Sequence, residues 1–507
     1  MKKIAKAAVF LALCVVLLLY TTKIFQKKFL DDNCQTYMAD ELYLLEDNSV
    51  EVVFCGSSQV VFGVSGMELY EKYGISAYST GSPSQSVLCS LGWLREIDKT
   101  QDIKVCVLDV SQLMEVSDES SYRQSIDLMR MSRNKLELAW QHVRESAAFS
   151  GDGELEQADS FLSYLFPILK YHSRWEELTW ADFGYTVEES PLFCGNCPAV
   201  YTTSFSGYDD LMEQETKKKS KIQVKEWEKT ALLQIQQYCE ENGIALVLIK
   251  TPKEDWTETK QERVQALAEE LGLPYLDYAT EAGCEELGLD FYTDFKDQQH
   301  LNLRGADKLS DAVGAYLKQH YDLTDFRETA PMDDAELEKY HAVRRRVYFK
   351  TEGDVVSFLT QLQEDYLSTG EYDLVLELSD DAICDAWTDE MQAAWERCGL
   401  TTDLSQLKGK TYVASIVNGT VEEKSSTARE LTRTGELSNG GSWKATSTMQ
   451  SDRLTRPEIQ TGGSTTEFAA SGLNLVLYHS TAGEITAQSA IALCQDGRLR
   501  ANQKPER

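Results

Sequence analysis

The sequence has too few basic residues to bind nucleic acid. Its 50 Lys and Arg residues stand against 82 Asp and Glu residues, which gives a formal net charge of −32. A surface with this excess of negative charge repels phosphate backbones, so we expect no nucleic-acid partner. A neutral or cationic glycan or a small molecule is the substrate class that this charge favours. With 42% hydrophobic residues, the chain is globular rather than disordered.

Recognisable nucleotide and metal motifs are also missing. No Walker motif is present, and no glycine fingerprint follows an expected strand. Twelve cysteines fit no small disulfide scaffold in 507 residues, and one Cys194-x-x-Cys197 pair is weak evidence for a metal site. We therefore predict no metal and no cofactor. A local Cys194–Cys197 disulfide is the favoured interpretation, with two reduced thiols or redox chemistry as alternatives.

One long hydrophobic run occurs, at the N-terminus. Three lysines precede Ala7–Thr22, which has no charge and is long enough for a tilted membrane span. A cleaved signal peptide is the alternative, but no small-x-small cleavage site follows the run. Bulky Leu13 argues against lipidation at Cys14. We expect a single-pass plasma-membrane anchor at residues 1–28, with the basic end in the cytoplasm and the bulk of the chain extracytoplasmic.

Beyond the anchor, near-continuous apolar strands alternate with helical patterns over residues 29–328. This pattern predicts an α/β domain with a parallel sheet covered on both faces, and a site beyond the carboxyl ends of its strands. Residues 150–215 interrupt the pattern. They predict an insertion that is either a lid or substrate wall, or a helical excursion packed on the surface. The expected strands are Val50–Cys55, Ile75–Ser79, Val105–Val110, Ala245–Ile249 and Pro274–Leu276.

The composition changes again at residues 329–345, which are acidic, poor in aromatics and predict a linker. A second domain of α+β class is expected at 346–507. Residues 424–470 are rich in Thr, Ser and Gly, as turns and edge strands are. The expected elements are a helix at Val355–Thr369 and strands at Tyr372–Leu378, Thr411–Val417 and Leu473–Tyr478.

A serine at a strand end and a distant His–Asp pair could form a nucleophilic site. Ser58 follows the first expected strand, where the backbone N–H groups of the next turn could hold an oxyanion. His300 is one of only six histidines and lies in a polar loop before a helix. Asp297 could fix the imidazole tautomer that accepts the serine proton. The alternatives are a serine that caps a helix and a solvated Asp–His pair.

Other residues are candidates for supporting this site. Gly81 lies in a turn after the second expected strand and offers a further oxyanion N–H. Asp109 ends the third strand at the same edge of the sheet, where it could order the Ser58 loop or cap the segment that follows. Gln59 and Asn302, which neighbour the nucleophile and the base in sequence, complete the set.

The motifs Gly56-Ser57-Ser58-Gln59, the Gly81 turn and Asp297-Gln-Gln-His300-Leu-Asn-x-x-Gly305 resemble the SGNH/GDSL hydrolase superfamily. They resemble most its membrane-anchored members that act on cell-envelope polymers of Gram-positive bacteria. The resemblance covers residues 48–322 and implies a three-layer, flavodoxin-like α/β sandwich. It also implies Ser58 as the nucleophile, His300 as the general base, Asp297 as its orienting acid, and the N–H groups of Ser58 and Gly81 as oxyanion donors.

The chain departs from that family pattern twice. Ser57 stands where the commoner motif has Asp. No Gly-x-Asn-Asp block is present, since the third strand ends Leu108-Asp109-Val110-Ser111, and the usual Asn donor is missing or replaced.

Parts of residues 345–495, above all Gly472-Leu-Asn-Leu-Val, resemble the interleukin-like EMT inducer (ILEI/PANDER) domain. That resemblance implies a binding module for carbohydrate. Together, the two resemblances imply an extracytoplasmic serine esterase or O-acyltransferase that acts on acyl esters, above all acetyl esters, of a cell-envelope glycan. The alternative is a catalytically inactive, surface-anchored protein that binds carbohydrate through its C-terminal domain.

Overall fold

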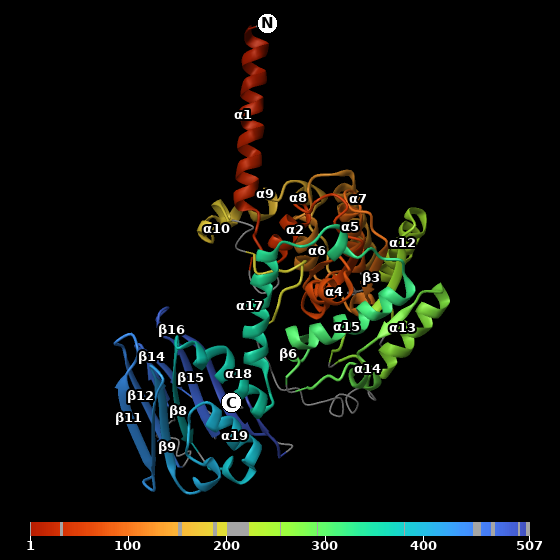
Figure 1. Ribbon diagram of the computed structural model, residues 1–507. Helices are drawn as coiled ribbons and strands as arrows, with labels where there is room; N and C mark the ends of the chain where they lie inside the picture. The colour runs from red at the N-terminus through yellow and green to blue at the C-terminus, as the bar shows by residue number, and fades with distance from the viewer. Residues whose placement is uncertain are drawn as a thin grey trace. The chain divides into compact units, whose positions relative to one another are not determined.

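The chain folds as two compact units, Met1–Ala199 with Ser204–Val343, and Val200–Thr203 with Arg344–Arg507 (Figure 1). The predicted linker at 329–345 is largely helical, because α17 (Asp334–Thr351) runs through it. The computed structural model describes residues 2–30, 34–150, 155–185, 190–199, 223–253, 255–291, 293–379, 381–449, 458–467, 472–494 and 497–502.

A parallel five-stranded sheet forms the centre of the first unit, in the order β2-β1-β3-β4-β5. This is the strand order of flavodoxin-like folds. The predicted α/β class is confirmed, with strand ends shifted by up to three residues. The strands are β1 (Val52–Ser57), β2 (Ala77–Ser82), β3 (Val105–Asp109), β4 (Ala245–Lys250) and β5 (Tyr275–Asp277).

Helices cover both faces of this sheet, which gives three layers. Side chains of one strand alternate between two hydrophobic cores: Val53 and Cys55 of β1 enter one, and Val52 and Phe54 enter the other. The first core is closed by α2 (Gln35–Leu42), α5 (Val87–Ile97), α7 (Arg133–Phe149), α12 (Glu226–Asn242) and α13 (Glu258–Leu271). The second is closed mainly by α4 (Gly66–Tyr73) and α15 (Leu303–His320).

The N-terminal helix α1 (Lys2–Phe25) is long and apolar enough to cross a membrane over Ile4–Phe25, and none of that window is buried in the protein. The described part of the predicted insertion is a series of short helical turns. These are α8 (Phe161–Leu165), α9 (Ile168–Tyr171), η3 (His172–Glu176) and α10 (Trp180–Phe183). Residues 151–154, 186–189 and 200–215 of that insertion lie outside the described residues.

Shorter elements complete the first unit. They are α3 (Ser58–Gly63), η1 (Ser111–Leu113), α6 (Glu119–Ile126), α14 (Glu281–Glu286), α16 (Phe326–Thr329) and a hairpin of β6 (Phe295–Asp297) and β7 (His300–Leu301).

Two antiparallel sheets and a helical layer make up the second unit. Residues such as Val375 and Trp443 fill a core between the sheets. The helices α18 (Val355–Gln361) and α19 (Asp389–Arg397) cover the other face of the larger sheet. After α18, the predicted helix continues as a π turn (Leu362–Tyr366) and η7 (Leu367–Thr369).

The larger sheet has the order β10-β9-β8-β15-β16-β17 and the smaller one β11-β12-β13-β14. Their strands are β8 (Tyr372–Ser379), β9 (Thr411–Val417), β10 (Thr420–Ser426), β11 (Glu430–Glu436), β12 (Ser442–Thr448), β13 (Glu458–Thr461), β14 (Ser464–Glu467), β15 (Gly472–His479), β16 (Glu484–Leu493) and β17 (Leu499–Arg500).

Candidate active site

Ser58 is the first residue of α3, directly after β1 ends at the carboxyl edge of the sheet. The serine that caps this helix is its neighbour Ser57, whose Oγ accepts the N–H of Gln59 at 3.3 Å. Gly56 lets β1 approach β3 here, because a Cβ at this position would come within 2.5 Å of Asp109 Cβ. The Ser58 hydroxyl is therefore not used by the cap and stands at the edge where active sites of this fold class lie.

His300 and Asp297 lie on the β6–β7 hairpin, whose two-residue turn brings them opposite each other. The Asp297 carboxylate accepts backbone N–H groups from Gln299 at 2.8 Å and from His300 at 3.0 Å. Its two oxygens also lie 2.9 and 3.0 Å from His300 Nδ1. The turn and its own carboxylate thus hold the imidazole in one orientation.

The structure brings these residues together with the serine, because Ser58 Oγ lies 2.7 Å from His300 Nε2. The His300 side chain is 17% exposed and that of Asp297 is 42% exposed, so the site is open to solvent on the Asp297 side. Burial acts to raise the pKa of Asp297, but hydrogen bonds from the His300 side chain and from the Gln299 N–H outweigh it and hold that pKa below its ordinary value. The carboxylate is ionised at neutral pH and directs the Nδ1 proton toward itself.

One aromatic contact at the imidazole was not expected from the sequence. The Phe62 ring of α3 meets the His300 ring edge-on, with 5.2 Å between their centroids. Lys296 Nζ lies 3.6 Å from the centre of the same Phe62 ring, in cation–π geometry. Phe62 therefore links the nucleophile helix to both strands of the hairpin.

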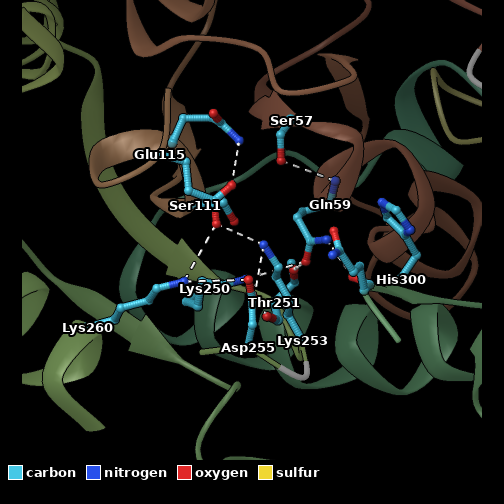
Figure 2. A network of polar contacts seen from close by, with 12 residues as sticks. Ser57, Gln59, Ser111, Glu115, Lys250, Thr251, Lys253, Asp255, Lys260 and His300 are labelled. Atoms are coloured by element: carbon cyan, nitrogen blue, oxygen red, sulfur yellow. Dashed lines mark hydrogen bonds and ion pairs between the residues drawn. The ribbon is translucent and has the colours of Figure 1, made fainter. Parts of the chain in front are cut away.

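Gln59 connects the nucleophile helix to the His300 loop and to the end of β4 (Figure 2). Its Nε2 donates to the carbonyl of Gln299 at 2.5 Å. Its Oε1 accepts from Thr251 Oγ1 at 2.6 Å and from Lys250 Nζ at 3.3 Å. Gln59 is thus buried with both ends of its amide engaged. Sequence reasoning missed Lys250 and Thr251; the available signal was a lysine ending an otherwise apolar strand.

The Lys250 ammonium is fully buried beside this amide, and Nζ also donates to the carbonyl of Thr251 at 2.8 Å. Burial lowers the pKa of Lys250 to about 8, although the charge of Asp109 acts in the opposite direction. The Trp256 ring lies 5.1 Å from Nζ. This lysine does not touch Ser58 or His300, so it reaches the reacting groups only through Gln59.

Asp109 lies behind the nucleophile turn rather than in contact with Ser58. Its Oδ2 accepts from Ser57 Oγ at 2.9 Å, and its Oδ1 accepts from the Oγ and N–H of Ser111 at 2.8 and 3.2 Å. Both functions considered from the sequence are therefore present, because the buried carboxylate orders the Ser58 turn and also caps the segment after β3.

Gly81 and Asn302 hold positions beside the site. Gly81 lies within β2, paired with Gly56, rather than in a turn as predicted. A Cβ there would come within 2.7 Å of the Ser57 carbonyl, so the glycine permits close packing under the nucleophile turn. Asn302 caps α15: its Oδ1 accepts two N–H groups of the first turn and its Nδ2 donates to Thr293 O at 2.6 Å. It fixes the chain just after His300.

The Cys194–Cys197 pair forms no disulfide, so that prediction is wrong. The Cys194 thiol lies 3.8 Å from Met67 Sδ, and burial raises its pKa to about 12. The backbone of this segment reaches the site, since the N–H of Cys197 donates to the Val61 carbonyl in α3. Within the described ranges, no group of three or more His, Cys, Asp or Glu side chains is arranged to hold a metal ion.

No family model and no curated protein matches this sequence. Among solved structures, a "putative acylhydrolase" from Bacteroides fragilis is similar at 10% identity over 55% of this chain and 94% of its own, with a TM-score of 0.27. A GDSL-like lipase from Bacteroides thetaiotaomicron is similar at 10% identity over 57% of this chain and 98% of its own, with a TM-score of 0.26. Similarity this low carries no argument about activity, which rests on the geometry of the site.

Proposed function

We propose that the first unit is a serine esterase or acyltransferase with Ser58 as its nucleophile. The observation that carries the proposal is the chain of contacts from Ser58 Oγ to His300 Nε2 at 2.7 Å and from His300 Nδ1 to Asp297 at 2.9 Å. A serine hydroxyl is a weak nucleophile unless an adjacent base takes its proton and a third group orients that base. These three side chains stand in that relation.

In the proposed reaction, Ser58 Oγ attacks the carbonyl carbon of an ester while its proton passes to His300 Nε2. The imidazolium is stabilised by the ionised Asp297. Collapse of the tetrahedral intermediate breaks the bond to the alcohol, which leaves with the proton from His300. Water, or a hydroxyl of an acceptor, then attacks the acyl-serine with His300 again as the base, and Ser58 is regenerated.

The oxyanion would be held by backbone N–H groups. We assign Ser58 and Gly81 as donors, since Ser58 begins α3 and Gly81 lies in the adjacent strand against the nucleophile turn. Asp109 supplies no donor in place of an asparagine amide, because its carboxylate has no N–H and its oxygens accept from Ser57 and Ser111. The oxyanion site therefore depends on main-chain donors more than a site with an amide side chain does.

The proposed substrate class is supported by the apolar N-terminal helix and by the net charge. With α1 in the plasma membrane and its basic end in the cytoplasm, the catalytic unit faces the cell envelope. A chain with net charge −32 is suited to a neutral or cationic glycan carrying acyl esters, acetyl above all. The second unit would bind carbohydrate, as its resemblance to the ILEI/PANDER domain implies.

Arylacetate hydrolysis by the detergent-solubilised full chain tests the proposal. Ser58→Ala and His300→Ala should each lower kcat by at least about 10³-fold. His320→Ala, which alters an exposed histidine stacked on Tyr316, serves as the control and should retain full activity. A fluorophosphonate probe should modify the Ser58 peptide, as read by mass spectrometry. Full activity in Ser58→Ala would refute the assignment.

A second candidate function is a catalytically silent glycan-binding surface protein. The carboxylate at the end of β3, where the family pattern has an asparagine donor, favours it. The two candidates give opposite results: persistent inertness of Ser58 toward the probe, together with measurable binding of envelope glycan by the full chain, would support the silent protein.

A further inference from the structure

Exposed apolar side chains gather next to the point where α1 ends. Outside α1, thirteen large hydrophobic side chains of the described residues are exposed, and six of them fall within 22 consecutive residues. We call these six the α8–α10 patch: Leu162, Phe166, Leu169, Trp175, Trp180 and Phe183. Trp180 is 90% exposed. A soluble surface rarely concentrates large apolar groups in this way unless the patch contacts a partner.

These residues lie on a run of short helical turns. Leu162 is in α8, Phe166 follows that turn in a non-helical conformation, and Leu169 is in α9. The Trp180 and Phe183 rings of α10 lie 6.4 Å apart between centroids. The patch is therefore presented by helical turns, with two indole rings at its C-terminal part.

Direct contacts tie this segment to the end of α1. Arg174 Nη1 donates to the carbonyl of Phe25 at 2.8 Å, and its Nη2 lies 3.3 Å from Asp182 Oδ1 in α10. A cation at a helix C-terminus satisfies free carbonyls and is favoured by the helix dipole. Gln26, the next residue after α1, donates to the Asp127 carbonyl at 2.9 Å. Figure 1 shows α9 and α10 beside the end of α1.

We infer that the α8–α10 patch lies in the lipid interface of the leaflet from which α1 emerges. Its occupant is the boundary between headgroups and acyl chains, because the patch continues the surface of a helix that is itself apolar and unburied over Ile4–Phe25. Indole rings are favoured at that depth, where an apolar ring and a polar N–H meet both phases.

This contact would fix how the first unit stands on the membrane. Arg174 and Gln26 connect the end of α1 to the domain, and the patch would add a second attachment to the membrane. Figure 1 shows β6, which carries Asp297, well away from α8–α10 and α1. The Ser58 site would then open toward the envelope rather than toward the bilayer. The inference rests on α1 as a membrane span and not on the proposed catalysis, so the two can fail separately.

Quenching of tryptophan fluorescence tests the contact on the full chain in phosphatidylcholine nanodiscs with and without brominated acyl chains. Only three of the nine indole rings are exposed: Trp140, Trp175 and Trp180. The variant Trp175→Phe/Trp180→Phe keeps the patch apolar and should lose at least about half of the bromine-dependent quenching, since interfacial rings approach the lipid. Trp140→Phe is the comparison at the edge of the patch, because the Trp140 ring lies 5.5 Å from that of Phe161 in α8, and it should lose less of the quenching than the double variant.

Equal quenching in the wild type and the double variant would overturn the inference. A second result would also overturn it, namely that aqueous iodide quenches Trp175 and Trp180 as strongly in nanodiscs as it does without lipid. The patch would then face water and be open to a protein partner. Loss of lipid quenching in Trp140→Phe alone would move the lipid contact to α7 and overturn it as well.

Discussion

The substitution Gln59→Glu should slow catalysis while leaving the fold intact, because the two ends of this amide do different work. A glutamate keeps an acceptor oxygen for Thr251 Oγ1 and places a carboxylate 3.3 Å from the buried Lys250 ammonium. It removes the donor that holds the Gln299 carbonyl, and sets a second oxygen against that carbonyl instead. The perturbation therefore falls on the loop that carries His300.

The magnitude follows from that one contact. Exchange of this part-buried hydrogen bond for two oxygens that face each other costs about 1–2 kcal/mol. If the cost is expressed as displacement of the His300 loop, kcat should fall by roughly 5- to 30-fold, since about 1.4 kcal/mol is a factor of ten in rate. KM should change little, because Gln59 is buried and does not reach the substrate.

Arylacetate kinetics and thermal unfolding, measured together, separate this role from a structural one. Thr251→Val is the matched control: it removes only the hydroxyl on the other end of the amide, so it should lower Tm but leave kcat within about threefold, since the Gln299 contact remains. A Gln59→Glu enzyme with wild-type kcat and KM would refute the reasoning. So would a Thr251→Val enzyme as slow as Gln59→Glu.

Two further predictions concern carboxylates. Asp297→Asn should lower kcat by about 10²- to 10⁴-fold in the same assay, because an amide can donate toward His300 Nδ1 and favour the wrong tautomer; an unchanged rate would exclude Asp297 from the proton relay. In the second unit, burial raises the pKa of Glu377 from 4.5 to about 8. Between these two pH values the folded state keeps a proton that the unfolded state releases, so the free energy of unfolding falls as the pH rises. The Glu377→Gln side chain can keep the contacts with Ser379 and Asn474, so this variant should raise the free energy of unfolding at pH 8 by about 1–3 kcal/mol. Unfolding curves at pH 5 and pH 8 measure this difference. The same change in unfolding free energy between pH 5 and pH 8 in both proteins would contradict the prediction.

The parallel sheet could be predicted because buried strands are continuous apolar runs between helical patterns. Their ends could not, and β2 shows why. The sequence favours a stop at Ser79, but Thr80-Gly81-Ser82 pair with Cys55-Gly56-Ser57 of β1, so that the strand extends through residues typical of a turn. Pairing with a neighbour overrides local preference at a strand end. The four strands from β11 to β14 fall within residues 424–470, where turns and edge strands are expected, and β10 begins before that range. β10 and β11 are largely exposed and carry no clear apolar alternation.

The reacting groups were accessible from the sequence, whereas their supports were not. Asp297 and His300 are three residues apart, so a single turn can bring them together. Lys250 and Thr251 reach Gln59 only because β4 lies two places from β1 in the sheet, with β3 between them. Strand order is a tertiary property that one sequence does not reveal.

Ser57 and Asp109 meet beneath Ser58, and this argues that the nucleophile turn is held by dedicated contacts. Ser57, directly before Ser58, donates at 2.9 Å to Asp109, the carboxylate at the end of β3. The same Ser57 Oγ accepts the N–H of Gln59 and so caps the helix that begins with Ser58. A buried carboxylate is costly unless its lone pairs are used, and Ser57 with Ser111 uses them.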